Sequence, residues 1–150
     1  MALASAQRSG TLVGVLFVDL DDFKAVNDRH GHAAGDAVLC AVGARLHQLL
    51  RASDTVGRMG GDEFVAISPF LRTSADFDLV VQKVRDALRT VVLHEGVSIP
   101  VDGSVGAALF PRDADASTAL LALADADLYR EKGVRRLRSR QLAEGPLRSA

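Results

Sequence analysis

The chain has 150 residues, of which 48% are hydrophobic and 25% are charged, a composition typical of one soluble globular domain. Its 18 Lys and Arg nearly balance 19 Asp and Glu, so no global positive field favours binding to nucleic acid or to a membrane surface. The single cysteine, Cys40, excludes an intramolecular disulfide, and no apolar run approaches the ~20 residues of a membrane span.

The first predicted element, a strand, is preceded by ten residues that we expect to be disordered or to form a linker. These residues, 1–10, are small and polar. Residues 11–18 are aliphatic on both faces, which predicts a buried central strand. The polar segment that follows is expected to hold a short helix at 22–26, and the apolar spacing over 34–50 predicts a longer helix.

A hairpin is predicted next, because two short runs at 55–59 and 63–67 are joined by Gly60-Gly61. Thr73 or Ser74 can then cap a helix whose apolar face extends to Val91.

The last predicted elements are one strand over residues 97–109 and a helix that begins at Ser117 and ends near Gly133. Residues 138–150 are expected to form a basic, flexible tail, so that the folded domain spans 11–137. The order of elements predicts an α/β (α+β) fold: a single mixed, largely antiparallel sheet of about five strands with helices on both faces.

Two acidic clusters are placed where a site could form. Asp19-Leu20-Asp21-Asp22 follows the first strand, and Asp62-Glu63 lies in the hairpin turn. If the hairpin pairs beside the first strand, the clusters meet at one edge, and hard oxygen ligands of this kind suit Mg²⁺ or Mn²⁺. Taken singly, each cluster is equally compatible with ordinary turn chemistry.

These residues resemble those of a known family. Gly60-Gly61-Asp62-Glu63-Phe64 matches the signature of the GGDEF family of diguanylate cyclases, and Asp19 to Asp28 resembles its D-x-D-x-F-K-x-x-N-D segment. Further matches cover about residues 11 to 136 in the same order: Gly31-His32, Gly35-Asp36, Arg58, Ser104-Val105-Gly106 and Ala124 to Tyr129. The resemblance implies a fold related to nucleotide cyclases and polymerase palms.

The resemblance implies condensation of two GTP into cyclic di-GMP and two pyrophosphates by two domains that face each other as a homodimer. It implies two Mg²⁺ or Mn²⁺ per site, held by Asp19, Asp62 and the Leu20 carbonyl. Asp62 also occupies the position proposed as general base, and Lys24 matches a lysine near the phosphates. Glu63 assists with the metal or is a surface carboxylate of the hairpin.

The resemblance also implies substrate contacts. Asn27 and Asp36 match residues that recognise guanine, and His32 matches a further contact. The alternatives are a turn residue for Asn27 and a helix N-cap for Asp36. Gly60 and Gly61 leave room for a phosphate at the turn. Lys132 and Arg136 match the residues that meet the triphosphate, although the run could also be a solvated tail.

Two departures from the family pattern stand in this sequence. The family reads A-K-x-x-G-R-N after its last helix signature, whereas Arg135 here fills the place of the glycine. The family's D-x-L-T-G-L-x-N-R-R segment is absent before the first strand, so the chain is similar to a domain that lacks its N-terminal segment.

A product-inhibition site is implied by Arg51-Ala52-Ser53-Asp54, which resembles the family's R-x-x-D site for cyclic di-GMP. The alternative is an exposed ion pair at a helix end. The family also implies a cytoplasmic location and an upstream sensor domain in a longer protein, which could be membrane-anchored. Two other functions stay open: an inactive GGDEF module that binds GTP or cyclic di-GMP and regulates a partner, and a mononucleotide cyclase or polymerase-like palm.

Overall fold

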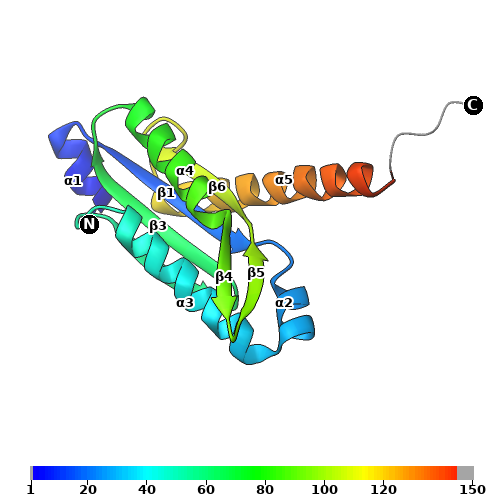
Figure 1. Cartoon of the computed structure of the whole chain (residues 1–150). Helices are drawn as coiled ribbons and strands as arrows, with labels where there is room; N and C mark the ends of the chain where they lie inside the picture. Colours follow the sequence, from blue (N-terminus) through cyan, green and yellow to red (C-terminus); the bar gives the residue numbers. More distant parts are fainter. Residues whose placement is uncertain (1, 145–150) are drawn as a thin grey trace, which may run out of the picture.

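A computed structural model describes the backbone of residues 2–144 and the side chains of residues 2–141. The elements follow in the order α1 (Ala2–Ser9), β1 (Leu12–Leu20), α2 (Phe23–His30), α3 (His32–Leu49), β2 (Thr55–Gly60), β3 (Glu63–Leu71), α4 (Ser74–Leu88), β4 (Thr90–His94), β5 (Val97–Val101), β6 (Gly103–Phe110) and α5 (Ser117–Glu144). Figure 1 shows the sheet at the centre and the second half of α5 extending away from it.

The main sheet has four strands in the order β2-β3-β1-β6, and each neighbouring pair is antiparallel. This confirms a largely antiparallel sheet with helices. The strand count differs from the expectation of about five strands in one sheet, because β4 and β5 form a separate two-stranded sheet. The run over 97–109 divides at Asp102, whose carboxylate accepts a hydrogen bond from the Gly103 amide (2.8 Å) and supports the turn.

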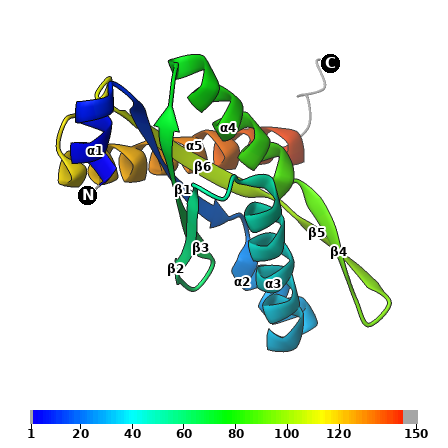
Figure 2. The same ribbon diagram turned by 90° about the vertical axis from the view of Figure 1, so that its left-hand side faces the viewer.

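Helices cover both faces of the main sheet, as predicted (Figure 2). On one face, α3 and α4 bury the larger core, which includes Leu16, Val18, Val42, Phe77 and Leu88. On the other face, α1 and α5 cover a smaller core around Val13, Val15 and Phe110. Strand β1 contributes to both cores, so the prediction of a buried central strand is confirmed.

The N-terminal residues differ from the expectation of disorder, since residues 2–9 form helix α1. Alanine has the highest helix propensity, and Ala6 is buried against the smaller core. The Thr11 amide donates to the Ala6 carbonyl (3.1 Å) and closes the helix onto β1. The high helix propensity of alanine and the burial of one face of α1 outweigh the polar composition of this segment.

Helix α5 does not end near Gly133 as expected but continues to Glu144. A glycine inside a helix costs only about 1 kcal/mol, and ion pairs on both sides of Gly133 offset that cost. The predicted flexible tail is therefore helical over 138–144, and its remaining residues, 145–150, lie outside the described part of the chain.

The approach of α5 to β6 depends on Gly106. A Cβ atom at this position would overlap the Ala124 carbonyl and the Leu128 amide of the helix backbone. The helix therefore packs directly on the strand backbone, and Ala124 and Leu128 are buried there. This contact directs the second half of α5 toward the end of β1, where the acidic residues lie.

Candidate functional site

Asp19 occupies the end of β1 and is one of the few buried polar residues, with 7% of its surface exposed. The register places it between Glu63 on β3 and Ser104 on β6. Its Oδ2 atom lies 2.5 Å from the Lys132 ammonium of α5. A carboxylate buried at a strand end is compensated here by one basic side chain from a distant part of the chain.

The diglycine turn joins β2 to β3 beside that strand end. Gly61 has φ 53°, a left-handed conformation in which glycine carries no Cβ penalty. Apart from the two residues adjacent in the chain, a Cβ atom at Gly60 or Gly61 would have no atom within 4 Å. The turn therefore needs glycine at Gly61 for its backbone conformation, and the surface beside both glycines is open.

The two acidic clusters converge as the hairpin prediction required. The Leu20 amide donates to the Asp62 carbonyl (3.3 Å), which ties the turn to the end of β1. Burial, and after it the negative charge of Asp19, raises the pKa of Asp62 above its ordinary value of 3.8. The two carboxylates therefore repel each other, and a cation between them would relieve that repulsion.

The donor set of this edge suits Mg²⁺ or Mn²⁺. Asp19 and Asp62 supply carboxylate oxygens, and the backbone at Leu20 supplies a carbonyl. Among the described residues, no group of three or more His, Cys, Asp and Glu side chains forms a closed metal cage. Few protein ligands are usual for Mg²⁺, which keeps water and substrate phosphates in its coordination shell.

The predicted guanine-contacting residues lie on α2 and α3. Asn27 is half-buried and its amide packs against Gly35, where a Cβ atom would overlap Asn27 Oδ1. Asp36 and His32 are exposed on α3, and Gly31 occupies the N-cap position, so the N-cap alternative for Asp36 is wrong. Asn27 lies within α2, which makes the turn alternative wrong as well.

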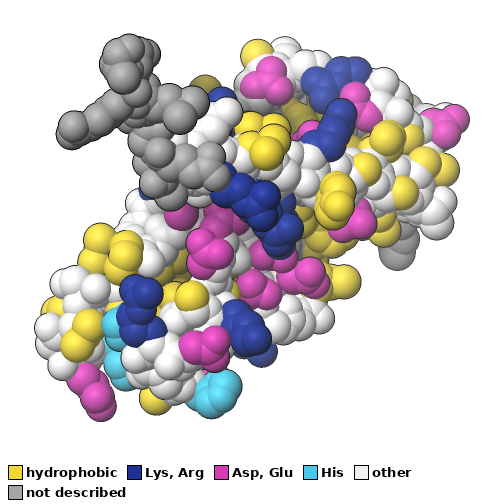
Figure 3. Space-filling view, turned by 90° about the vertical axis from the view of Figure 1, so that its right-hand side faces the viewer, with side chains coloured by type: hydrophobic (Ala, Val, Ile, Leu, Met, Phe, Trp, Pro, Cys, Tyr) yellow, Lys and Arg dark blue, Asp and Glu magenta, His cyan; other side chains and the backbone are white. Residues whose placement is uncertain are grey.

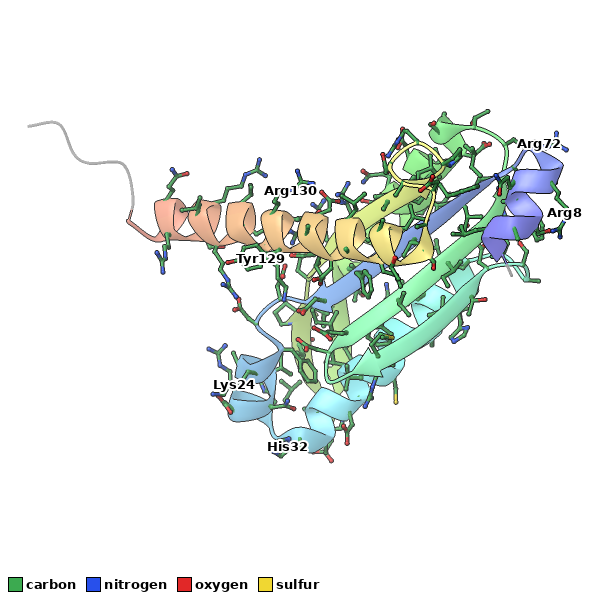
Figure 4. The ribbon with its side chains drawn as sticks, turned by 180° about the vertical axis from the view of Figure 1, so that it is seen from behind. Arg8, Lys24, His32, Arg72, Tyr129 and Arg130 are labelled. Atoms are coloured by element: carbon green, nitrogen blue, oxygen red, sulfur yellow. The ribbon has the colours of Figure 1, made fainter. Side chains whose placement is uncertain are left out.

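Lys24 is exposed on α2, and Figure 4 shows it at the same end of the molecule as His32 and far from Arg8. Figure 3 shows a group of Asp and Glu side chains at the centre of the face, beside several Lys and Arg side chains, with the His side chains toward one edge. The structure thus brings the predicted metal-binding and guanine-binding segments to one end of the sheet.

The basic residues of α5 divide between two environments. Lys132 reaches Asp19, whereas Arg136 is exposed. Arg135, the residue that replaces the glycine of the family pattern, contacts Asp21 (3.0 Å) and Asp102 (2.8 Å). Its spacing of three residues from Lys132 is the signal that places both on one helix face.

The segment that resembles the inhibitory site forms a turn after α3. Asp54 accepts hydrogen bonds from the Arg51 amide (2.9 Å) and from the Ser68 hydroxyl (2.9 Å), while the Arg51 side chain is exposed. A pocket beside the turn is lined by both residues together with Asp76 and Lys83 of α4. Among the described side chains, Asp54 is held by the Arg51 amide and the Ser68 hydroxyl and forms no ion pair with the Arg51 guanidinium, so the alternative of an exposed ion pair is wrong.

Comparison with known proteins decides the family. The model described as "Diguanylate cyclase, GGDEF domain" matches residues 1–138. The chain belongs to the GGDEF family. The resemblance drawn from the sequence motifs is therefore confirmed, and the family match includes α1.

One relative illustrates the relationship in both sequence and structure. The diguanylate cyclase TpbB of Pseudomonas aeruginosa is 40% identical over 144 residues, which cover 95% of this chain but 33% of TpbB. The solved structure of a shortened TpbB that comprises only the GGDEF domain has a TM-score of 0.84 at 39% identity, covering 87% of this chain and 77% of that chain. This chain thus spans about a third of TpbB.

Another solved structure contains a ligand. The GGDEF domain of DgcB from Caulobacter crescentus, solved in complex with c-di-GMP, has a TM-score of 0.76 at 26% identity and covers 87% of this chain and 78% of that chain. In the described part of our GGDEF domain, no helix has the length and apolar character needed to span a membrane.

Proposed function

We propose that this GGDEF domain is a diguanylate cyclase, which condenses two GTP into cyclic di-GMP and two pyrophosphates. The observation that supports it most is the convergence of Asp19 and Asp62 at one end of the sheet, tied by the hydrogen bond from Leu20 to Asp62. An exposed guanine-binding segment next to a cation-binding acid pair is what a nucleotide-condensing enzyme needs.

The residues divide into three groups in this proposal. Asp19, Asp62 and the Leu20 carbonyl hold two Mg²⁺ or Mn²⁺, which offset triphosphate charge and acidify the attacking hydroxyl. Asn27, Asp36 and His32 bind guanine, because its N–H donors suit a carboxylate and its other edge suits an amide. Lys24, Lys132 and Arg136 contact phosphates, and the open backbone at Gly60 and Gly61 admits them.

Two copies of the domain are needed in the proposed reaction. The 3′-hydroxyl of one GTP forms a bond to the α-phosphorus of the other, whose bond to the β-phosphate oxygen breaks and releases pyrophosphate. The reciprocal attack closes the ring and releases the second pyrophosphate. Asp62, or water beside it, accepts the hydroxyl proton. Because each domain holds one GTP, a homodimer brings the two reacting nucleotides together.

Product inhibition is a further part of the proposal. Cyclic di-GMP binds at the exposed Arg51 guanidinium, beside the pocket formed by the Arg51–Asp54 turn and α4. The guanidinium can pair with a guanine edge and with a phosphate of the product. Asp54 shapes this turn through its bonds to the Arg51 amide and Ser68.

The chain works as the output domain of a longer cytoplasmic or membrane-anchored protein in this proposal, with a sensor domain upstream. The support is that it spans 33% of TpbB. The domain is proposed to span residues 11–137, with α1 packed against it through Ala6.

The test is product identification after incubation of GTP with Mg²⁺ and the protein. We expect cyclic di-GMP and pyrophosphate, and about a thousandfold less of both from Asp62→Asn, since a bound cation supplies several kcal/mol of transition-state stabilisation. The variant should fold, and Mg²⁺ should raise the melting temperature of the wild type only. A folded, dimeric, Mg²⁺-loaded wild type that makes no dinucleotide would instead be a binding module.

A further inference from the structure

Arg135 is the centre of an ion-pair network on α5. Its guanidinium lies 3.0 Å from Asp21, 2.8 Å from Asp102 and 3.5 Å from Glu131. These acids come from the end of β1, the turn between β5 and β6, and the preceding turn of α5. The Arg135 side chain is 23% exposed, so the pairs are partly shielded from water. A planar guanidinium can serve several carboxylates at once, which a lysine ammonium does less well.

Two of these acids, Asp21 and Glu131, are also fixed by other groups. Asp21 accepts a hydrogen bond from the Ser104 hydroxyl of β6 (2.8 Å). Glu131 accepts from the Val105 amide of β6 (3.2 Å) and pairs with Arg85 of α4 (2.7 Å). The network therefore connects α5 to groups that the sheet and α4 hold in place.

The second half of α5 depends on these polar contacts. Its buried apolar side chains are Leu120, Ala124 and Leu128, and among the residues described beyond Leu128 none is a buried apolar side chain. Apolar packing thus ends one turn before Lys132. From there, the helix is held to the body by Lys132 on Asp19 and by Arg135 on Asp21 and Asp102.

We propose that Arg135 is a positioning residue that clamps α5 to Asp21 and Asp102 and thereby holds the Lys132 ammonium at Asp19. Lys132 and Arg135 are three residues apart and share one helix face, while Asp19 and Asp21 flank Leu20. The two contacts therefore act as parallel ties between the same two segments. With a glycine at position 135, as in the family pattern, the Lys132–Asp19 ion pair would be the one remaining contact of the two. The catalytic consequence rests on the proposed function, but the clamp itself does not.

The clamp also affects the charge of the site. Without the guanidinium, Asp21 and Asp102 are left without this counter-charge close to Asp19, and Lys132 is less well held. A more negative site should bind triphosphate less tightly and divalent metal at least as tightly. A variant that merely loosens the fold would weaken the binding of both triphosphate and metal. Comparing the two affinities therefore distinguishes a loss of positioning from a general loss of structure.

The experiment compares Arg135→Gln and Arg135→Lys with Arg138→Gln, which removes an exposed arginine from the same helix. The probes are 3′-deoxy-GTP, which lacks the attacking hydroxyl, and Mn²⁺ alone, both measured by titration. We expect Arg135→Gln to weaken 3′-deoxy-GTP binding about tenfold while Mn²⁺ binding is unchanged or tighter. Arg135→Lys should recover part of the nucleotide affinity, and Arg138→Gln should match the wild type.

Hydrogen exchange supplies a readout that does not depend on nucleotide chemistry. Amides of residues 132–140 should exchange about tenfold faster in Arg135→Gln than in the wild type or Arg138→Gln. Unchanged exchange in this segment overturns the clamp even if the wild type makes no cyclic di-GMP. Two results would overturn the positioning role even if exchange is faster. One is an unchanged affinity for 3′-deoxy-GTP, and the other is an equal fall in the affinities for 3′-deoxy-GTP and Mn²⁺.

Should Arg135→Gln fail to fold, Asp102→Asn tests the same contact from the other side, because the asparagine keeps its bond to the Gly103 amide. It should accelerate exchange in residues 132–140 by a smaller factor. An Asp102→Asn protein that exchanges like the wild type overturns the proposal.

Discussion

The amide of Asn27 packs against Gly35 at the place where any other residue would carry its Cβ atom. This contact joins α2 to the first turns of α3 and fixes a side chain that we assign to guanine binding. The glycine of the G-H-x-x-G-D segment therefore has a steric role, because it leaves space for the neighbouring asparagine.

Gly35→Ala is expected to raise the KM for GTP about tenfold without lowering stability. The added methyl group displaces the Asn27 amide, and alanine favours the helix by about 1 kcal/mol. Gly43→Ala on the same helix is the matched control, since its Cβ atom would meet only Phe64 at 3.6 Å. Steady-state kinetics and urea denaturation measure both quantities. Equal KM values for the two variants would contradict the role of Gly35.

The two residues of the proposed inhibitory site should respond differently. Arg51→Ala removes an exposed side chain, so we expect at least tenfold weaker inhibition by cyclic di-GMP with an unchanged initial rate. Asp54→Ala removes the acceptor for the Arg51 amide and for buried Ser68, and should also cost about 1–2 kcal/mol of stability. Inhibition curves and denaturation midpoints separate the two effects. If cyclic di-GMP inhibits Arg51→Ala as strongly as the wild type, Arg51 does not bind the product.

Gly106→Ala should destabilise the domain by about 1–3 kcal/mol or more, because the methyl group pushes α5 away from β6. The control is Gly57→Ala on β2, where a Cβ atom would meet Val65 at 3.9 Å, an ordinary contact. The free energy of unfolding in urea is the measurement for both variants. Similar free energies of unfolding for the two variants would show that α5 can move away from β6 without destabilising the domain.

Asp113 should make stability depend on pH. The Arg112 guanidinium, and after it the Leu109 amide, hold the pKa of Asp113 below its ordinary value of 3.8. Its contribution is therefore present above pH 3.8 and is lost as the pH falls through the lower folded-state pKa. Because this side chain is partly exposed, Asp113→Asn should cost only about 0.5–1 kcal/mol at pH 7.

Denaturation of Asp113→Asn and wild type at pH 7, 5, 4 and 3 checks this dependence. The difference in unfolding free energy should be constant down to about pH 4 and then shrink. The same substitution at exposed Asp125 controls for the loss of one negative charge. A difference that grows as the pH falls would contradict the assignment.

The sequence determined the local elements and the identity of the family. The aliphatic run of β1, the diglycine turn and the Thr73 cap are each encoded by residues within a few positions, and the cap forms as a full capping box with Asp76. The pairing of the hairpin with β1 also followed, because an apolar strand needs neighbours on both sides. Asp19 and Asp62 could therefore be placed together in advance.

Only the tertiary structure decided what lies beyond the reach of such patterns. Helix α1 is ordered by burial of Ala6 against β1 and β6, and α5 continues past Gly133 because its polar face meets acids at the sheet end. Arg135 rather than Arg136 turns toward Asp21, a residue 114 positions earlier. Contacts between residues so far apart in the chain leave no spacing signal in the sequence. They depend on the close packing of α5 on β6, which Gly106 permits.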